Sequence, residues 1–207
     1  MPAPFRQHRG VAAALPADNI DTDQIIPSRE MKAVSRDGLG EGLFAGWRYT
    51  APGGREPVAD FVLNRPEQVG TSILVSGNNF GCGSSREHAV WALADYGVRA
   101  VIAKSFGEIF HGNCLRNGIL PVTLSEGEVD RLLKLDGGAE IAIDLEAQTV
   151  TAEALPGWTG RFEIGAYAKR LLLEGLDPIG LTLLQAPEIS AYQRADAARR
   201  PWVYSGG

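Results

Sequence analysis

The chain has 207 residues, 44% of them hydrophobic, with a formal net charge of -5 and a pI near 5.3. A chain of this length can bury one substantial hydrophobic core. Its acidic balance argues against nucleic acid or an anionic membrane surface as the main partner, because both favour a basic protein face.

The N-terminal residues contain one short apolar run, from Val11 to Leu15. That run is too short for the core of a signal peptide or for a membrane span. The chain has two cysteines, Cys82 and Cys114, and they form neither a disulfide framework nor a C-x-x-C motif. We therefore expect a cytoplasmic protein in a reducing compartment.

The cysteine and histidine content also limits the metal chemistry. Two cysteines, together with His8, His88 and His111, show no zinc-ligand spacing. They cannot supply the three or four thiolates that an iron–sulfur cluster needs. If the reaction requires such a cluster, another chain must carry it.

The first 70 residues are rich in proline and glycine. The segments DGLGEGLFAGW (37–47) and APGGREP (51–57) are typical of loops, so we predict a mobile loop over about 36–57. Because this loop contains Phe44 and Trp47, we expect it to close on a bound group rather than to be disordered.

Strand and helix patterns alternate after residue 70. Strands are predicted at 73–77, 100–103 and 120–124, with helical periodicity over about 84–96 and 105–117. This alternation predicts parallel strands joined by helical crossovers. Four further elements are predicted: a short helix opened by Ser125 and Glu128, a hairpin over 139–153, a helix over 165–174 closed by Gly175, and a peripheral helix over about 187–200.

The stretch GNNFGCGSSREHAV, residues 77–90, combines small residues with a serine pair and an arginine. One interpretation is structural: Ser84 and Glu87 fit the S-x-x-E capping box of a helix. The other is an anion site, because glycines let the backbone approach a ligand and helix N–H groups attract negative charge. Arg86 adds a planar fork suited to a carboxylate or phosphate. The third glycine of a dinucleotide fingerprint and the lysine of a Walker A loop are both absent, which favours a small carboxylate.

Two other stretches contain chemically active residue types. In NIDTDQIIPSRE (19–30), Asp21 and Asp23 are expected to hold a turn, and Arg29 is either a surface charge or a second carboxylate clamp. In KSFGEIFHGNCLRNG (104–118), a cysteine–histidine pair is conceivable, although a lone buried cysteine is more often inert. A cysteine hydrolase therefore remains an alternative.

Six motifs, taken together and in order, resemble the small-subunit family of 3-isopropylmalate dehydratases in the aconitase superfamily. They are NIDTDQIIPSRE (19–30), LFAGWRY (43–49), DFVLNRP (60–66), NNFGCGSSREHAVWALADYG (78–97), KSFGEIFHGNCLRNGILPV (104–122) and GLTL (180–183). The resemblance covers nearly the whole chain.

The resemblance implies one swivelling domain of the α/β class over residues 1–207, in a three-layer β/β/α arrangement. It also implies a partner, a large subunit with a [4Fe-4S] cluster, in a heterodimer or heterotetramer. The reaction implied is the interconversion of 2-isopropylmalate and 3-isopropylmalate through 2-isopropylmaleate, in leucine biosynthesis. No metal is expected on this chain.

The resemblance also assigns roles to residues. Ser84 matches the serine that acts as base on the substrate carbon, and Ser85 and Arg86 match contacts to a substrate carboxylate. Arg29 matches a further basic contact. For the isopropyl group we expect apolar contacts from the mobile loop, namely Leu39, Leu43 and Phe44.

The motifs do not distinguish this substrate from related ones. A small subunit acting on methylmalate, citraconate or a dimethylmalate would need a pocket that differs by a methyl group or two, which changes binding by roughly 1–3 kcal/mol. A non-catalytic carboxylate-binding module is a further alternative from another class.

Overall fold

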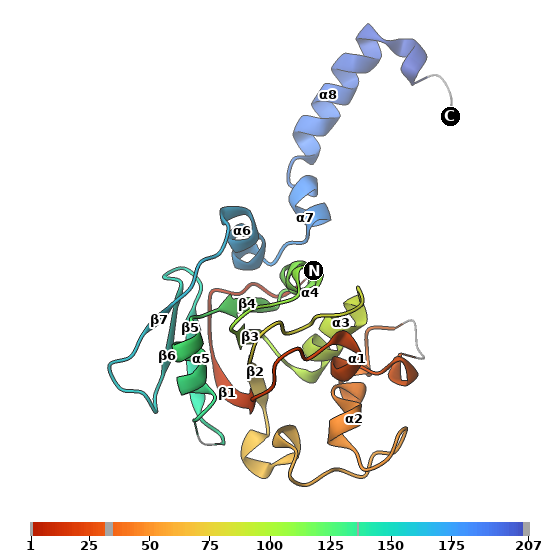
Figure 1. Ribbon diagram of the computed structural model, residues 1–207. Helices are drawn as coiled ribbons and strands as arrows, with labels where there is room; N and C mark the ends of the chain where they lie inside the picture. The colour runs from red at the N-terminus through yellow and green to blue at the C-terminus, as the bar shows by residue number, and fades with distance from the viewer. Residues whose placement is uncertain (1, 32–34, 136, 205–207) are drawn as a thin grey trace.

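The computed structural model describes residues 2–31, 35–135 and 137–204. It shows a rounded body from which the C-terminal helices project as an arm (Figure 1). Within these described ranges, no helix has the length and apolarity needed to cross a membrane.

One seven-stranded mixed sheet forms the body, in the order β4-β3-β2-β1-β5-β6-β7. The strands are β1 (Gln7–Leu15), β2 (Thr71–Ser76), β3 (Ala100–Ala103), β4 (Leu120–Thr123), β5 (Glu140–Asp144), β6 (Thr149–Ala152) and β7 (Gly160–Arg161). Strands β1 to β4 pair in parallel, whereas β5 to β7 continue the sheet antiparallel from the other edge of β1. The predicted parallel pairing with crossovers is therefore confirmed.

Most helices are short and lie in the connections between strands. The α-helices are α1 (Thr22–Ile25), α2 (Ala45–Arg48), α3 (Glu87–Tyr96), α4 (Glu108–Arg116), α5 (Glu126–Leu132), α6 (Ala166–Glu174), α7 (Pro178–Leu183) and α8 (Ala186–Arg199). Short 3-10 helices add to them: η1 (Ser28–Glu30), η2 (Leu39–Gly42), η3 (Val62–Asn64), η4 (Pro66–Gln68) and η5 (Pro201–Val203).

The sheet separates two hydrophobic clusters, and this arrangement produces the three layers. On one face, side chains of β1, β2 and β3 such as Ala13, Leu74 and Val101 pack with those of α3 and α4. On the other face, side chains such as Ile73 and Ile102 pack with those of β5 and β6. The sheet therefore curls until its antiparallel part covers its parallel part, which gives the predicted β/β/α order.

The strand β1 was not predicted, although it lies in the middle of the sheet. Its sequence, QHRGVAAAL, has a single β-branched residue, Val11, and no Phe, Tyr or Trp, the residue types that mark most strands. Tight packing explains one of its small residues, because a Cβ at Gly10 would lie 2.0 Å from the Ser72 hydroxyl oxygen. Small residues let neighbouring strands pack closely, but their low strand propensity makes such a segment hard to recognise as a strand from its sequence.

The helix α3 begins later than predicted. It starts at Glu87 with Arg86 as its N-cap, and no side chain caps it. The capping-box interpretation of Ser84 and Glu87 is therefore wrong. The equivalent box at α5 is confirmed, because the Glu128 carboxylate accepts hydrogen bonds from the N–H and the hydroxyl of Ser125, at 3.1 and 2.5 Å.

Part of the segment over 36–57 packs into the core, whereas most residues over 50–57 are exposed. Its side chains Leu39, Leu43 and Phe44 are 0–3% exposed and belong to the cluster beside α3. Backbone N–H groups hold it there, with that of Gly40 donating to the Asp95 carboxylate at 2.7 Å and that of Phe44 donating to the Ile25 carbonyl at 2.7 Å. Burying these apolar side chains in the core stabilises the protein more than leaving them exposed at the surface would.

Candidate functional site

The loops that follow β1, β2 and β3 meet at one edge of the sheet. These strands are parallel, so their carboxyl ends lie together, and ligands of open α/β sheets bind at such edges. The loop after β2, residues 77–86, lies between segments from the other two loops. Three of the six sequence motifs thus form one region.

Backbone hydrogen bonds fix the glycine-rich loop on both sides. The N–H of Gly81 donates to the Ile20 carbonyl at 2.7 Å, and the N–H of Phe80 donates to the Ser105 carbonyl at 3.0 Å. The N–H of Gly107 donates back to the Phe80 carbonyl at 2.9 Å. The loop is therefore a fixed part of the body, up to the point where it exposes its serines.

Two glycines in this loop are required by its conformation. Gly81 and Gly83 have φ values of 74° and 90°, in the left-handed region that other residues rarely adopt. A Cβ at Gly81 would also lie 2.1 Å from the ring of Phe110 on α4. The glycines let this loop pack directly on the start of α4.

A cavity of about 260 Å³ lies between the loop and the start of α4. It is lined by Thr22, Gly81, Cys82, Gly83, Ser84, Ser85, Arg86, Gly107, Glu108, Ile109, Phe110 and Asn113. The predicted residues Ser84, Ser85 and Arg86 are thus brought together with the first turn of α4. Helix N–H groups at this turn favour a negatively charged ligand.

Both serines of the pair present free hydroxyl groups. Ser84 and Ser85 are exposed, and within the described residues neither hydroxyl makes a hydrogen bond. The backbone of Ser84 is nevertheless fixed, because its carbonyl accepts a hydrogen bond of 3.0 Å from the Thr22 hydroxyl. Thr22 is 2% exposed, so a buried side chain fixes the backbone of Ser84.

Arg86 is oriented by an acidic partner. Its Nη1 donates to the carboxylate of Asp23, which also accepts a hydrogen bond of 3.4 Å from the Ser28 hydroxyl. The side chain of Arg86 is 23% exposed. This ion pair connects the loop after β2 with α1 and η1, the elements that carry the NIDTDQIIPSRE motif.

Arg29 lies in η1, next to this network and outside the set of cavity residues. Its Nε lies 3.4 Å from the Glu30 carboxylate, which also accepts a hydrogen bond of 2.7 Å from Arg55. The buried carboxylate of Glu30 therefore sits between two arginines. The role of Arg29 as a contact to a substrate carboxylate stays a prediction.

The predicted specificity residues lie elsewhere. Leu39, Leu43 and Phe44 point into the core and are not among the residues that line the cavity. By contrast, Ile109 lines the cavity with 55% of its surface exposed. Sequence reasoning missed Ile109 because an apolar residue in a predicted helix is normally assigned to the core.

The surroundings of the two cysteines disfavour a nucleophilic role. Cys114 is completely buried, and burial raises the pKa of its thiol far above the usual range. Burial and the nearby Asp21 carboxylate also raise the pKa of Cys82, so the reactive thiolate is disfavoured. Burial lowers the pKa of His111, which favours the neutral imidazole.

No metal-binding cluster is formed within the described ranges, where no group of three or more His, Cys, Asp or Glu side chains could hold an ion. Two cysteines, one of them in the core, do not fit an iron–sulfur cluster.

Comparison with known proteins identifies the family. Residues 2–127 match the family model of the aconitase C-terminal domain, and residues 179–204 match the model of the C-terminal domain of 3-isopropylmalate dehydratase small subunits. The crystal structure of 3-isopropylmalate dehydratase (leuD) from Methanocaldococcus jannaschii is similar, with a TM-score of 0.65 and 28% identity. That match covers 90% of this chain and 99% of the other.

Sequence relatives agree over the full length. The 3-isopropylmalate dehydratase small subunit of Cupriavidus necator is 55% identical over 208 residues, which cover 99% of each chain. The protein of the same name from Sinorhizobium fredii is 51% identical over 202 residues, which cover 96% of this chain and 98% of the other. The chain belongs to the family of 3-isopropylmalate dehydratase small subunits, and its fold is that of the aconitase C-terminal domain.

Proposed function

We propose that this chain is the small subunit of a 3-isopropylmalate dehydratase, a hydro-lyase of leucine biosynthesis. With a large subunit it interconverts 2-isopropylmalate and 3-isopropylmalate through 2-isopropylmaleate. One observation carries this proposal: three of the motifs shared with the family meet around a single cavity that presents Ser84, Ser85 and Arg86. Since both cysteines are free thiols, we place the reaction in the cytoplasm.

In this function Ser84 is the base that takes the proton from the substrate carbon. A free serine hydroxyl is far too weak an acid to provide an alkoxide near neutral pH, so the negative charge needs stabilisation. Helix N–H groups and the Arg86 guanidinium lie around the same cavity and can supply it. The hydrogen bond from Thr22 holds the backbone of Ser84 without occupying its hydroxyl.

Arg86 binds a substrate carboxylate, and Ser85 donates a second contact. A guanidinium has five N–H donors, and the ion pair with Asp23 uses Nη1. The remaining donors can meet a carboxylate side by side, a geometry that lysine cannot provide. We assign the contact for the second carboxylate to Arg29, which lies at the edge of the same network.

The departing hydroxyl group needs an electrophile that this chain does not hold. In the proposed assembly, a [4Fe-4S] cluster of the large subunit supplies a Lewis acid for that group. The proton-transfer half and the hydroxyl-transfer half of the reaction are thus carried by different chains. The isolated small subunit should therefore be inactive.

Ile109 is our candidate for the contact to the isopropyl group. It is the large apolar side chain that is both exposed and in the cavity beside Ser84. The earlier candidates Leu39, Leu43 and Phe44 can act on specificity only through the packing of the core. A pocket of this kind separates substrates that differ by one methylene group by about 10–200-fold.

The proposal is tested by measuring hydration of 2-isopropylmaleate by absorbance, under anaerobic conditions. The chain is assayed alone and with a cluster-loaded large subunit, and the mixture is then assayed with citraconate and dimethylmaleate. We expect activity only in the mixture, with the isopropyl substrate preferred. Activity of the chain alone would contradict the proposal, and preference for citraconate would assign the chain to a related hydro-lyase.

A further inference from the structure

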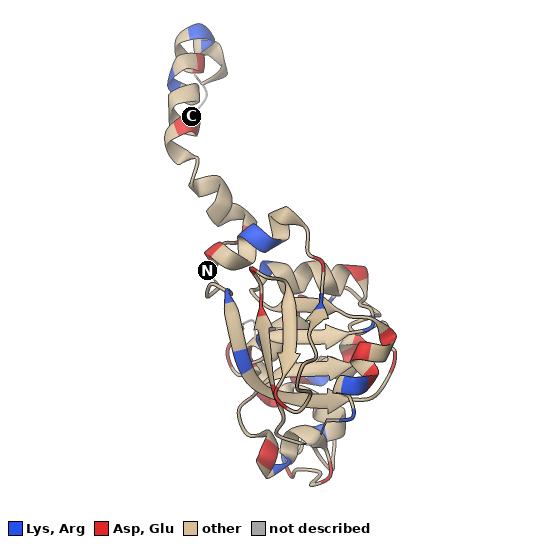
Figure 2. Ribbon diagram, turned by 90° about the vertical axis from the view of Figure 1, so that its left-hand side faces the viewer, with Lys and Arg blue, Asp and Glu red and all other residues tan. Residues whose placement is uncertain are grey.

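The C-terminal arm, defined here as residues 178–204, is exposed along most of its length. Figures 1 and 2 both show α7 and α8 pointing away from the body. The side chains over 182–195 are exposed, apart from a half-buried Ser190. At about 1.5 Å per residue, α8 is roughly 21 Å long. A helix of this length is marginally stable in water on its own, so packing against another surface would stabilise it.

The arm carries most of the exposed large apolar side chains. In the described part of the molecule, eight of eleven such side chains lie on it. They are Ile179, Leu183, Leu184, Ile189, Tyr192, Trp202, Val203 and Tyr204. Apolar surface concentrated in this way marks a protein interaction site, and Trp and Tyr are the residue types that dominate binding energy in interfaces.

A polar network orders the tip of the arm before any partner binds. Asp196 is 8% exposed, and its carboxylate accepts two hydrogen bonds of 2.8 Å from Arg200 and one of 3.0 Å from the Tyr204 hydroxyl. These bonds fold η5 back towards α8. As a result, Trp202 is presented with 71% of its surface exposed. Such preorganisation lowers the entropic cost of binding.

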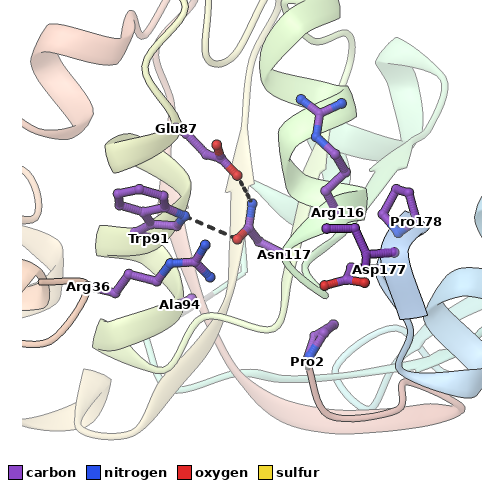
Figure 3. Close-up of a pocket in the computed structure, with 10 residues that line it drawn as sticks. Pro2, Arg36, Glu87, Trp91, Ala94, Arg116, Asn117, Asp177 and Pro178 are labelled. Carbon is purple, nitrogen blue, oxygen red and sulfur yellow. Dashed lines mark hydrogen bonds between the residues drawn. The ribbon is translucent and has the colours of Figure 1, made fainter. Parts of the chain in front are cut away.

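The root of the arm adds a concave region. A cavity of about 460 Å³ is lined by residues of the body together with Asp177, Pro178 and Ile179 at the start of α7 (Figure 3). On the body side, the guanidinium of Arg36 lies 4.6 Å from the ring centroid of Trp91. Ile179 belongs to both the cavity and the arm's apolar surface, so the two form one continuous region.

The cavity at the arm's root adjoins the candidate site, because Glu87 lines the former and its neighbour Arg86 lines the latter. The outer part of the arm, from α8 onwards, instead projects away from the body (Figures 1 and 2). A partner that holds this outer part therefore need not occupy the catalytic edge. It can stay attached while that edge opens for the substrate.

We propose that the arm is a tether that binds the large subunit independently of the catalytic interface. The body matches a model of a domain of aconitase, whereas the arm matches a separate model that is specific to the small subunit. A domain that is a chain of its own needs a noncovalent attachment in place of a peptide link, and a tether raises its effective concentration at the partner. The surface recognised is an apolar groove with acidic groups opposite Arg194 and Arg199. Among the described residues, the ion pair on this helix is made by Arg200 with Asp196 and leaves Arg194 and Arg199 without a partner.

This proposal rests on the proposed function only for the partner's identity, so binding is measured apart from activity. Full-length variants Tyr192→Glu and Trp202→Glu are titrated against the large subunit by calorimetry. Val69→Glu, at an 81% exposed apolar residue of the body, is the matched control. We expect Kd to rise at least about tenfold for both arm variants. The control should leave Kd unchanged, and kcat at saturating large subunit should stay within about twofold of the parent.

Three results would overturn the tether. The first is an unchanged Kd in both arm variants. The second is loss of kcat at saturation, because the arm would then act on the catalytic site. The third is a dimer of the chain alone, seen by light scattering and abolished by the arm variants while Kd for the large subunit stays the same. Binding without isopropylmaleate activity in the parent pair would instead contradict the proposed function and leave the tether intact.

Discussion

At the scale of single residues, the site depends on positions where only one kind of side chain fits. Gly81 illustrates this, because its backbone is left-handed and the Phe110 ring occupies the place of a Cβ. The glycines of this loop could be recognised in the sequence from their density. The structural need for them, which is contact with a helix in a later part of the chain, could not be recognised from the sequence.

We predict that Gly81→Ala lowers the free energy of unfolding by about 2–4 kcal/mol, because it adds both overpacking and a disfavoured φ. Gly127→Ala is the matched control. Gly127 is exposed in α5, has an ordinary φ and has open space around its Cβ position. We expect that change to stabilise the protein by about 0.5 kcal/mol. Urea denaturation measures both, and equal effects of the two changes would contradict this account of the loop.

The thiols provide a second test at this scale. With a thiol-specific chromogenic reagent near pH 8, Cys114 should react only on unfolding, since it is completely buried and its thiol pKa is raised by burial. Cys82 should react more slowly than a free cysteine, because its raised pKa reduces the thiolate fraction. Cys82→Ala and Cys114→Ala should retain activity in the assembled enzyme. Loss of turnover in either variant would favour the cysteine-hydrolase alternative.

At the scale of elements, local sequence signals were reliable where the local contacts decide the structure. The strands β3 and β4 and the capped helix α5 follow from hydrophobic runs and a capping motif. Two features failed for a tertiary reason. The strand β1 has only one β-branched residue and a glycine that packs tightly on Ser72, and α3 starts at Glu87 because the Ser84 backbone is held by Thr22.

Two identical S-x-x-E patterns should therefore respond differently to mutation. Ser125→Ala should cost about 1 kcal/mol, since it removes a helix cap. Ser84→Ala should change stability by less than about 0.5 kcal/mol, because its hydroxyl caps nothing. Thermal or urea unfolding of the two variants decides this. A cost of about 1 kcal/mol for Ser84→Ala would restore the capping role.

Specificity can be separated from core packing in the same way. Phe44→Ala should destabilise the protein by about 3–5 kcal/mol, as for other buried aromatic residues. In the surviving folded fraction, the ratio of rates for isopropyl and methyl substrates should stay constant. Ile109→Ala should leave stability nearly unchanged and shift that ratio by about tenfold. The opposite pattern would return specificity to the segment over 36–57.

At the scale of the whole molecule, the fold class and the family follow from the sequence because the motifs span nearly the entire chain. The meeting of three of them at one sheet edge needed the structure, since it depends on the parallel order of β1, β2 and β3. The arm was predicted as a peripheral helix, and the structure adds its exposed apolar surface and its ordered tip. In the proposed assembly, the body serves catalysis and the arm serves attachment.

The most direct test of the central claim is the turnover of Ser84→Ala in the assembled enzyme, measured as 2-isopropylmaleate hydration at saturating large subunit. We predict a loss of at least about 1000-fold in kcat, in the upper range for loss of a catalytic base, with Kd for the large subunit unchanged. Activity within about tenfold of the parent would contradict the assignment of Ser84 as the base.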